Sequence, residues 1–244
     1  DLVDPDQPFT VSDFRAHALE ALRDLAARDG IGILAGGTGF WLRAVTRGID
    51  TEALPHDAQV RADIEAALER DGLDALATRL RGVAPSLAAR TDLRNPRRVV
   101  RALEIATLRG DAPLPEPVGY PAPVLGLQLT VDDATLRQRI RDRARQQFDA
   151  GLVEEARTLR ERWDPKLPAF SAIGYREAWA YLDGGLTLDE SIALDALHNE
   201  QFSKRQRTWF RREPALAVID ATRDPTDVVT QAVDDWLEGV TVRR

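Results

Sequence analysis

Four clusters in this 244-residue sequence combine residue types that could bind an anion or a nucleic acid. The first is Gly36-Gly37-Thr38-Gly39, which follows an apolar run at 31–35. Glycines at the carboxyl end of a parallel strand let backbone N–H groups approach an anion, and a hydroxyl there can hydrogen-bond a phosphate or a substrate nitrogen. A tight strand-to-helix turn is the alternative, because the segment lacks the Lys-Ser/Thr ending of a P-loop.

Two clusters of arginine could contact phosphates, because the guanidinium group makes planar, forked hydrogen bonds to phosphate. Arg97, Arg98 and Arg101 lie at helical spacing, and a solvated basic face is the alternative for them. The other cluster has an arginine at every second position, which must spread the side chains around a helix. Arg139 and Arg143 are one turn apart and can face a common ligand. The full series is Arg137, Arg139, Arg141, Arg143 and Arg145.

The fourth cluster interleaves cations with aromatic rings at the end of a predicted helix. Recognition of an RNA loop needs this combination, since cations meet phosphates while an aromatic ring stacks on an exposed base. The alternative is structural, because cations near a helix C-terminus are favoured by the helix dipole. The cluster reads Lys204-Arg205-Gln206-Arg207-Thr208-Trp209-Phe210-Arg211-Arg212.

The elements that must position these clusters alternate between helices and strands. A helix capped near Thr10 and ended by Gly30 precedes the apolar run 31–35, which predicts a buried strand of a parallel sheet. A second strand, at 124–129, leads into a helix closed by Gly151. These patterns predict an α/β fold. Later helices are predicted at 153–162, 176–182 and 188–211, a strand at 217–220, and a terminal helix around 228–236.

Between these parts the chain changes character and predicts a helical insertion. Short amphipathic helices with glycine stops fill 54–87, and no strand-like run interrupts them. Asn95-Pro96 is a favourable cap and first turn for a further helix that ends near Gly110. The segment 111–123 contains five prolines and predicts a loop or extended connector.

Composition limits the possible functions. The formal net charge of −7 argues against nucleic-acid binding through bulk positive charge, so local clusters must supply it. The sequence has no cysteine, and three scattered histidines offer no zinc-ligand spacing. No apolar run is long enough to span a membrane, so we expect a cytoplasmic protein. The sequence begins with Asp1 and contains no methionine, so we expect native sequence upstream.

Four separated segments together resemble one family, the bacterial tRNA dimethylallyltransferases, also called tRNA isopentenyltransferases. They appear in the family's order across nearly the whole chain, and the combination is far more specific than any single piece. The segments are Ala35-Gly36-Gly37-Thr38-Gly39-Phe40-Trp41-Leu42, Asn95-Pro96-Arg97-Arg98-Val99-Val100-Arg101-Ala102-Leu103-Glu104, Ser171-Ala172-Ile173-Gly174-Tyr175-Arg176-Glu177, and Lys204-Arg205-Gln206 with Thr208-Trp209.

The resemblance implies a P-loop-NTPase-like parallel sheet with flanking helices, and a mainly helical insertion that contacts tRNA. It implies three parts: the remainder of a nucleotide-binding-like core at 1–50, the insertion at 51–118, and the rest of the core with tRNA-binding helices at 119–244. It also implies a monomer that transfers a dimethylallyl group from dimethylallyl diphosphate, with Mg²⁺, to the N6 amine of an adenine in the tRNA anticodon stem-loop. Such a base must leave its stack to react.

The resemblance assigns roles to individual residues. Thr38 is expected near the acceptor adenine, Arg143 at the diphosphate, and Gly36 and Gly37 beside it. No residue is assigned to a metal. The residues expected to contact tRNA are Arg61, Arg97, Arg98, Arg101, Ser171, Gly174, Tyr175, Arg176, Lys204, Arg205, Gln206, Thr208, Trp209 and Arg211.

The sequence also departs from the family pattern. The family's Gly-x-x-x-x-Gly-Lys-Ser/Thr loop and its proton-accepting aspartate have no counterpart here, so we expect the 244-residue chain alone to be inactive. Two alternatives remain open. One is a non-catalytic RNA-binding protein, and the other is a P-loop-related prenyltransferase or kinase that acts on free adenine nucleotides.

Overall fold

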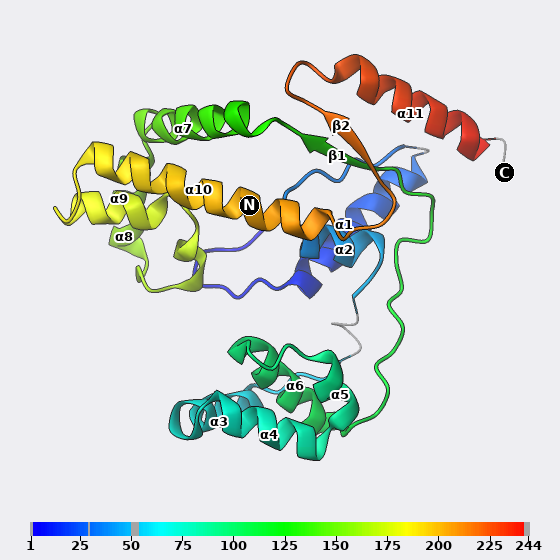
Figure 1. Ribbon diagram of the computed structural model, residues 1–244, viewed down its shortest axis with the longest axis vertical. Coiled ribbons are helices and arrows are strands. Elements are labelled where there is room, and N and C mark those ends of the chain that lie inside the picture. The colour runs from blue at the N-terminus through cyan, green and yellow to red at the C-terminus, as the bar shows by residue number, and fades with distance from the viewer. Residues whose placement is uncertain (1, 29, 50–53, 242–244) are drawn as a thin grey trace. The chain divides into compact units, whose positions relative to one another are not determined.

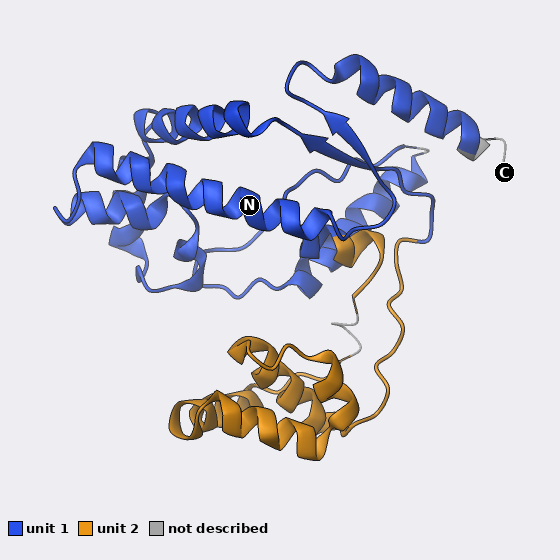
Figure 2. Ribbon diagram, in the orientation of Figure 1, with its two compact units in different colours: residues 1–42, 121–244 blue, residues 43–120 orange. Residues whose placement is uncertain are grey.

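The computed structural model describes residues 2–28, 30–49 and 54–241. The chain forms two compact units, one made of residues 1–42 and 121–244 and the other of residues 43–120 (Figure 2). The sequence-based division placed its boundaries after residues 50 and 118, whereas the units of the structure change after residues 42 and 120. No helix of the described chain is long and apolar enough to cross a membrane.

The larger unit begins with α1 (Val11–Ala27), which starts at a capping box. The Thr10 hydroxyl accepts a hydrogen bond from the Asp13 N–H at 3.3 Å, and the Asp13 carboxylate accepts one from the Thr10 N–H at 2.7 Å. These bonds satisfy two N–H groups at the helix start. Phe14 of α1 lies 4.8 Å, ring to ring, from Trp41 of α2 (Gly39–Thr46). The first turn of α1 therefore packs against α2, directly after the glycine cluster.

The sheet of this unit has two parallel strands, β1 (Gly126–Thr130) and β2 (Leu216–Asp220). Their register pairs Gly126 with Leu216 and Thr130 with Asp220. Each strand leads into a helix, β1 into α7 (Asp133–Asp149) and β2 into α11 (Thr226–Thr241), as Figure 1 shows. Parallel strands that each continue into a helix confirm the predicted α/β class.

The strand predicted at 31–35 is wrong. These residues form no strand in the described structure, and Ile31 and Ile33 are 58% and 90% exposed instead of buried. An apolar run becomes a strand only when another strand pairs with its backbone, and the described residues supply no such partner. The segment packs instead on the end of α1, where a Cβ on Gly32 would lie 2.3 Å from Leu22 Cδ2.

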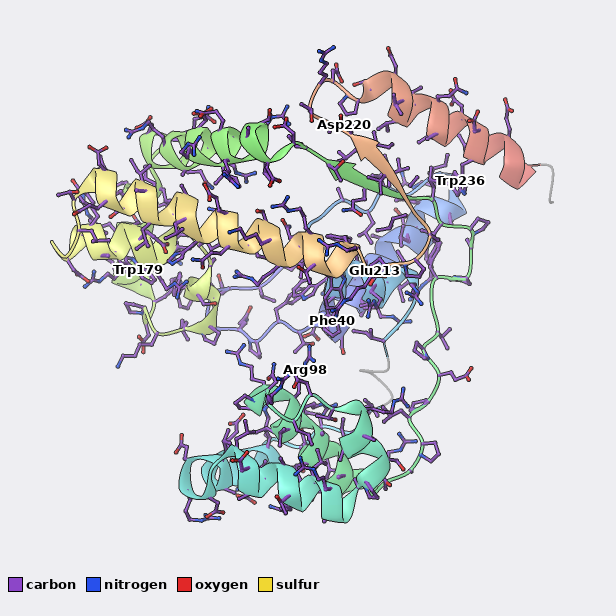
Figure 3. All side chains as sticks on the ribbon, viewed as in Figure 1. Phe40, Arg98, Trp179, Glu213, Asp220 and Trp236 are labelled. Atoms are coloured by element: carbon purple, nitrogen blue, oxygen red, sulfur yellow. The ribbon has the colours of Figure 1, made fainter. Side chains whose placement is uncertain are left out.

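A helical layer completes the larger unit. It consists of α7, α8 (Leu152–Arg162), a short 3-10 helix (Pro168–Ser171), α9 (Tyr175–Leu182) and the long α10 (Leu188–Phe210). Phe148, Phe170 and Trp179 are central to its buried core, and Figure 3 places Trp179 among these helices. The Trp179 indole N–H donates to the Ala156 carbonyl at 2.9 Å, so its polar atom is satisfied inside the core.

The smaller unit is helical, as predicted for the insertion. Its helices are α3 (Ala58–Asp71), α4 (Leu73–Val83), α5 (Pro85–Arg90) and α6 (Pro96–Arg109). Ile64, Leu80 and Leu103 are almost completely buried at its centre. Asn95 caps α6 through the Arg98 N–H, and Pro96 occupies the first turn, where its missing N–H costs no hydrogen bond. The proline-rich segment 111–123 contains no helix or strand, as predicted.

Candidate active site

The glycine cluster forms the entry into α2. The Thr38 carbonyl accepts hydrogen bonds from the N–H groups of Trp41 and Leu42 at 3.0 and 3.2 Å, so Thr38 begins the helix. The Thr38 side chain is exposed. Because the first N–H groups of a helix have no acceptor within the helix, and the helix dipole is positive there, this position favours an anion. The predicted diphosphate residues Gly36 and Gly37 stand directly before it.

The C-terminal end of α10 packs on this loop. The Gln206 side-chain amide donates to the Gly37 carbonyl at 2.9 Å across 169 positions of sequence. The indole of Trp209 lies against Gly39, where a Cβ would be only 2.0 Å from Trp209 Cδ1. Phe40 meets the same indole edge to face at 6.3 Å, and Figure 3 shows Phe40 beside the end of α10. The structure therefore brings the first and fourth predicted clusters together.

The last turns of α10 present two different faces. Gln206 and Trp209, three positions apart, face the glycine loop, whereas Lys204, Thr208 and Arg211 share the opposite side and are exposed. The Thr208 hydroxyl donates to the Lys204 carbonyl of its own helix at 2.9 Å. The exposed guanidinium of Arg205 lies 5.6 Å from the Phe202 ring. The fourth cluster thus combines an exposed cationic face with a face that supports the loop.

One arginine of the α7 series is left available for a ligand. Arg137 pairs with Asp133, Arg141 donates to Gln138, and Arg145 pairs with Asp189 at 3.1 Å. Arg139, which could share a ligand with Arg143, donates to the carbonyls of Ala221 and Thr222 and ties α7 to the end of β2. Arg143 is exposed and forms no hydrogen bond or ion pair with any described residue. Arg143 is therefore available to a ligand in solvent, and its contact with diphosphate stays a prediction.

Residues of α9 and α10 form a buried polar cluster that was not predicted from the sequence. Glu177 and Asp195 are each 1% exposed. Glu177 accepts from the Gly174 N–H at 2.8 Å and lies 2.6 Å from His198 Nδ1, while Asn199 donates to Asp195 at 2.9 Å. Burial raises the pKa of Asp195, with a further contribution from the charge of Glu177, whereas Asn199, His198 and Arg143 oppose the rise. Arg143 is therefore in the electrostatic neighbourhood of Asp195.

The predicted tRNA-contact loop at 171–176 contains both internal and exposed residues. Gly174 is buried with φ of +108°, a conformation that favours glycine. The Tyr175 hydroxyl donates to Glu155 at 2.6 Å, and burial together with this bond and the Glu155 charge raises the pKa of Tyr175 to about 12. Ser171 and Arg176 are exposed. The Ser171 hydroxyl donates to the Pro168 carbonyl at 2.7 Å, so a contact between Ser171 or Arg176 and tRNA stays a prediction.

The smaller unit carries the remaining predicted tRNA contacts. Arg97 and Arg98 are exposed at the start of α6, and Arg61 pairs with Glu65 on α3 at 3.0 Å. Arg101 is instead held inside the unit: it donates to the Pro55 carbonyl and to the fully buried Glu104, both at 2.8 Å.

Glu104 is the centre of that internal network. It also accepts from the Asp57 N–H and lies 2.5 Å from His56 Nδ1. Burial of Glu104 opposes its ionisation, but the bonds from Arg101, Asp57 and His56 lower its pKa. The network gives Arg101 a structural partner, and its contact with tRNA stays a prediction.

The described residues contain no evident set of ligands for the expected Mg²⁺. No group of three or more His, Asp or Glu side chains among the described residues is arranged to hold a metal ion. Mg²⁺ usually binds through one or two carboxylates together with substrate phosphates, so it stays a prediction and we assign no residue to it.

The sequence model of the IPP transferase family matches residues 1–213, which include all four clusters. The chain belongs to this family. It is 38% identical over 242 residues to the tRNA dimethylallyltransferase of Thioalkalivibrio sulfidiphilus, covering 95% of this chain and 75% of that protein. It is also 38% identical over 250 residues to the tRNA dimethylallyltransferase of Bordetella pertussis, covering 96% and 77%.

Solved structures of the family agree with the fold. The tRNA isopentenylpyrophosphate transferase of Bacillus halodurans aligns with a TM-score of 0.67 and 32% identity, covering 98% of this chain and 76% of that one. The corresponding Staphylococcus epidermidis protein, 23% identical, aligns with a TM-score of 0.61 and supports the fold alone. The family membership expected from the four motifs is confirmed.

Proposed function

We propose that this IPP transferase family member moves a dimethylallyl group from dimethylallyl diphosphate to the N6 amine of the adenine next to a tRNA anticodon. The observation that carries the proposal is the 38% identity, over 95% of the chain, to a relative named tRNA dimethylallyltransferase. The geometry supports it, because a helix with exposed cations at its end packs on a glycine loop suited to an anion.

In the proposed reaction the adenine nitrogen attacks the allylic carbon. A carbon–nitrogen bond forms, the carbon–oxygen bond to diphosphate breaks, and the amine loses a proton. The leaving diphosphate gains negative charge, which cations and N–H groups positioned in advance can stabilise. We assign the leaving diphosphate to Arg143 of α7 and to the N–H groups at the start of α2, and the acceptor adenine to the exposed Thr38 hydroxyl.

The proposed tRNA surface is built from exposed side chains. On the larger unit it comprises Lys204, Arg205 and Arg211 of the α10 end, together with Arg176. On the smaller unit the exposed Arg97 and Arg98 carry the same role, together with the half-buried Arg61, which pairs with Glu65. Since the net charge is −7, this binding depends on local arginine contacts to the anticodon stem-loop. We also propose that the protein is a monomer and that it acts in the cytoplasm, where bacterial tRNA is modified.

An assay with matched acceptors distinguishes the proposal from its alternatives. The protein expressed from its complete gene is incubated with labelled dimethylallyl diphosphate and Mg²⁺. The acceptors are a tRNA with adenine next to its anticodon, the same tRNA with guanine at that position, and free AMP. We expect label on the first acceptor only. Label on AMP would instead support an enzyme of free nucleotides, and tight tRNA binding without transfer would support a non-catalytic RNA-binding protein.

A further inference from the structure

Both neighbours of Thr38 are held by the same face of α10. On one side the Gln206 amide donates to the Gly37 carbonyl at 2.9 Å. On the other side the Trp209 indole lies against Gly39, which is buried. Thr38 itself remains exposed between these two contacts. The loop is therefore fixed through its backbone, and the side chain that it presents is left free.

At both contacts an added Cβ would force the α10 side chain to move, which the flexible amide end of Gln206 can do more easily than the Trp209 ring. A Cβ on Gly37 would lie 2.2 Å from Gln206 Nε2, and a Cβ on Gly39 would lie 2.0 Å from Trp209 Cδ1. Neither glycine has a positive φ, so the requirement comes from the packing and not from the backbone conformation. The two glycines next to Thr38 thus serve the contact with α10.

The orientation of Gln206 and Trp209 sets them apart from the cations around them. They point into the larger unit, whereas Lys204, Thr208 and Arg211 lie on the opposite, exposed face of the helix. One continuous 23-residue helix therefore carries the loop support on one face and the proposed tRNA contacts on the other. A rigid element of this kind keeps the distance between the two sites constant.

We propose that Gln206 and Trp209 are positioning residues, which place Thr38 for the transfer step by clamping Gly37 and Gly39. This role replaces the direct tRNA contact that the sequence predicted for both side chains. The assignment rests on the proposed function, because it gives the clamp its purpose. A loop displaced by about 1 Å would misplace the acceptor nitrogen and can slow a reaction about 100-fold without weakening substrate binding.

The test replaces Gln206 by glutamate in the full-length protein. Gln206→Glu has the same shape but loses the N–H donor and sets a carboxylate oxygen against the Gly37 carbonyl. We expect kcat to fall about 10- to 100-fold, while the Kd for tRNA and the KM for dimethylallyl diphosphate change less than about threefold. Gln201→Glu is the matched control, since Gln201 is an exposed residue of the same helix, and it should leave kcat unchanged.

Two further variants keep the test decisive. Gln206→His retains an N–H donor at similar reach and should recover most of kcat. Gly37→Ala pushes the Gln206 amide away from the other side, so its effect should not add to that of Gln206→Glu. A loss of tRNA affinity with kcat preserved would overturn the clamp and restore a direct tRNA contact.

Hydrogen exchange separates failure of the clamp from failure of the proposed function. Loop amides at 37–40 should exchange about fivefold faster in Gln206→Glu than in wild type or Gln201→Glu, the size expected for one lost hydrogen bond. If the wild-type protein does not prenylate tRNA, the proposed function fails, but the exchange result still tests the clamp. Unchanged exchange in Gln206→Glu would refute the clamp even in an active enzyme.

Discussion

Gly39→Ala probes the contact between the glycine loop and α10 with a single methyl group. The added Cβ would lie 2.0 Å from Trp209 Cδ1, 2.1 Å from Nε1 and 2.9 Å from Cγ. Carbon atoms in contact prefer about 3.5–4.0 Å, so the indole or the loop must shift by about 1.5 Å. We expect a loss of about 1–3 kcal/mol in the free energy of unfolding, and slower transfer because Thr38 moves with the loop.

Urea denaturation and transfer kinetics of a double-mutant cycle measure this effect. Trp209→Ala removes the ring that the methyl group meets, so Gly39→Ala should cost almost nothing in that background. The coupling between the two substitutions should therefore be about 1–3 kcal/mol. Equal destabilisation by Gly39→Ala with and without the Trp209 ring would refute the packing explanation.

A second glycine provides the matched control. Gly82 lies within α4, and a Cβ there would meet nothing within 4 Å. Gly82→Ala should therefore stabilise the protein by about 0.5–1 kcal/mol, because alanine favours a helix. Opposite signs for the same substitution at the two positions would show that the Trp209 contact, and not the loss of glycine, determines the outcome.

Three further predictions concern charge. Arg143→Ala should lower kcat about 100-fold, while Arg141→Ala, on the same exposed helix, should change it little; equal effects would remove Arg143 from the diphosphate site. Arg205→Ala should weaken tRNA binding in filter assays and reduce the slope of log K against log salt by about 1, and an unchanged slope would exclude a phosphate contact. The raised pKa of Asp195 means that the folded state holds this proton more tightly than the unfolded state, so its contribution to stability falls as pH rises above the ordinary value of 3.8. Asp195→Asn should lack that decline in urea denaturation as pH rises from about 3.8, and parallel pH profiles for the two proteins would contradict the assignment.

Local features of the chain were predictable from the sequence because their causes are local. Thr10 and Asn95 were expected to cap helices, and both side chains accept hydrogen bonds from the first turn. Asp132 likewise caps α7. Apolar spacing of 3.6 residues also predicted the long α10 to within one residue at its end.

Features that depend on distant partners were not predictable. The run at 31–35 has the composition of a buried strand, but no described strand pairs with it, and Ile33 is 90% exposed. Glu177 and Asp195 are charged residues, a type that is usually exposed, and the packing of α9 and α10 buries them.

The candidate site was also only partly predictable from the sequence, because it depends on contacts between distant residues. The spacing indicated that not every arginine of α7 could share a ligand. It did not show that Arg139 and Arg145 have partners on other elements, which leaves Arg143 as the available arginine. The contact between Gln206 and Gly37 spans 169 positions and left no signal in the sequence around either residue.

The most direct test of the proposed function is the mass of the nucleosides in the tRNA after reaction. Purified full-length protein is incubated with dimethylallyl diphosphate, Mg²⁺ and unmodified tRNA, and the tRNA is digested and analysed by mass spectrometry. We predict a single new nucleoside, an adenosine that carries one dimethylallyl group, located next to the anticodon and formed far more slowly by Arg143→Ala. A protein that binds the tRNA but leaves every adenosine unmodified would contradict the proposal.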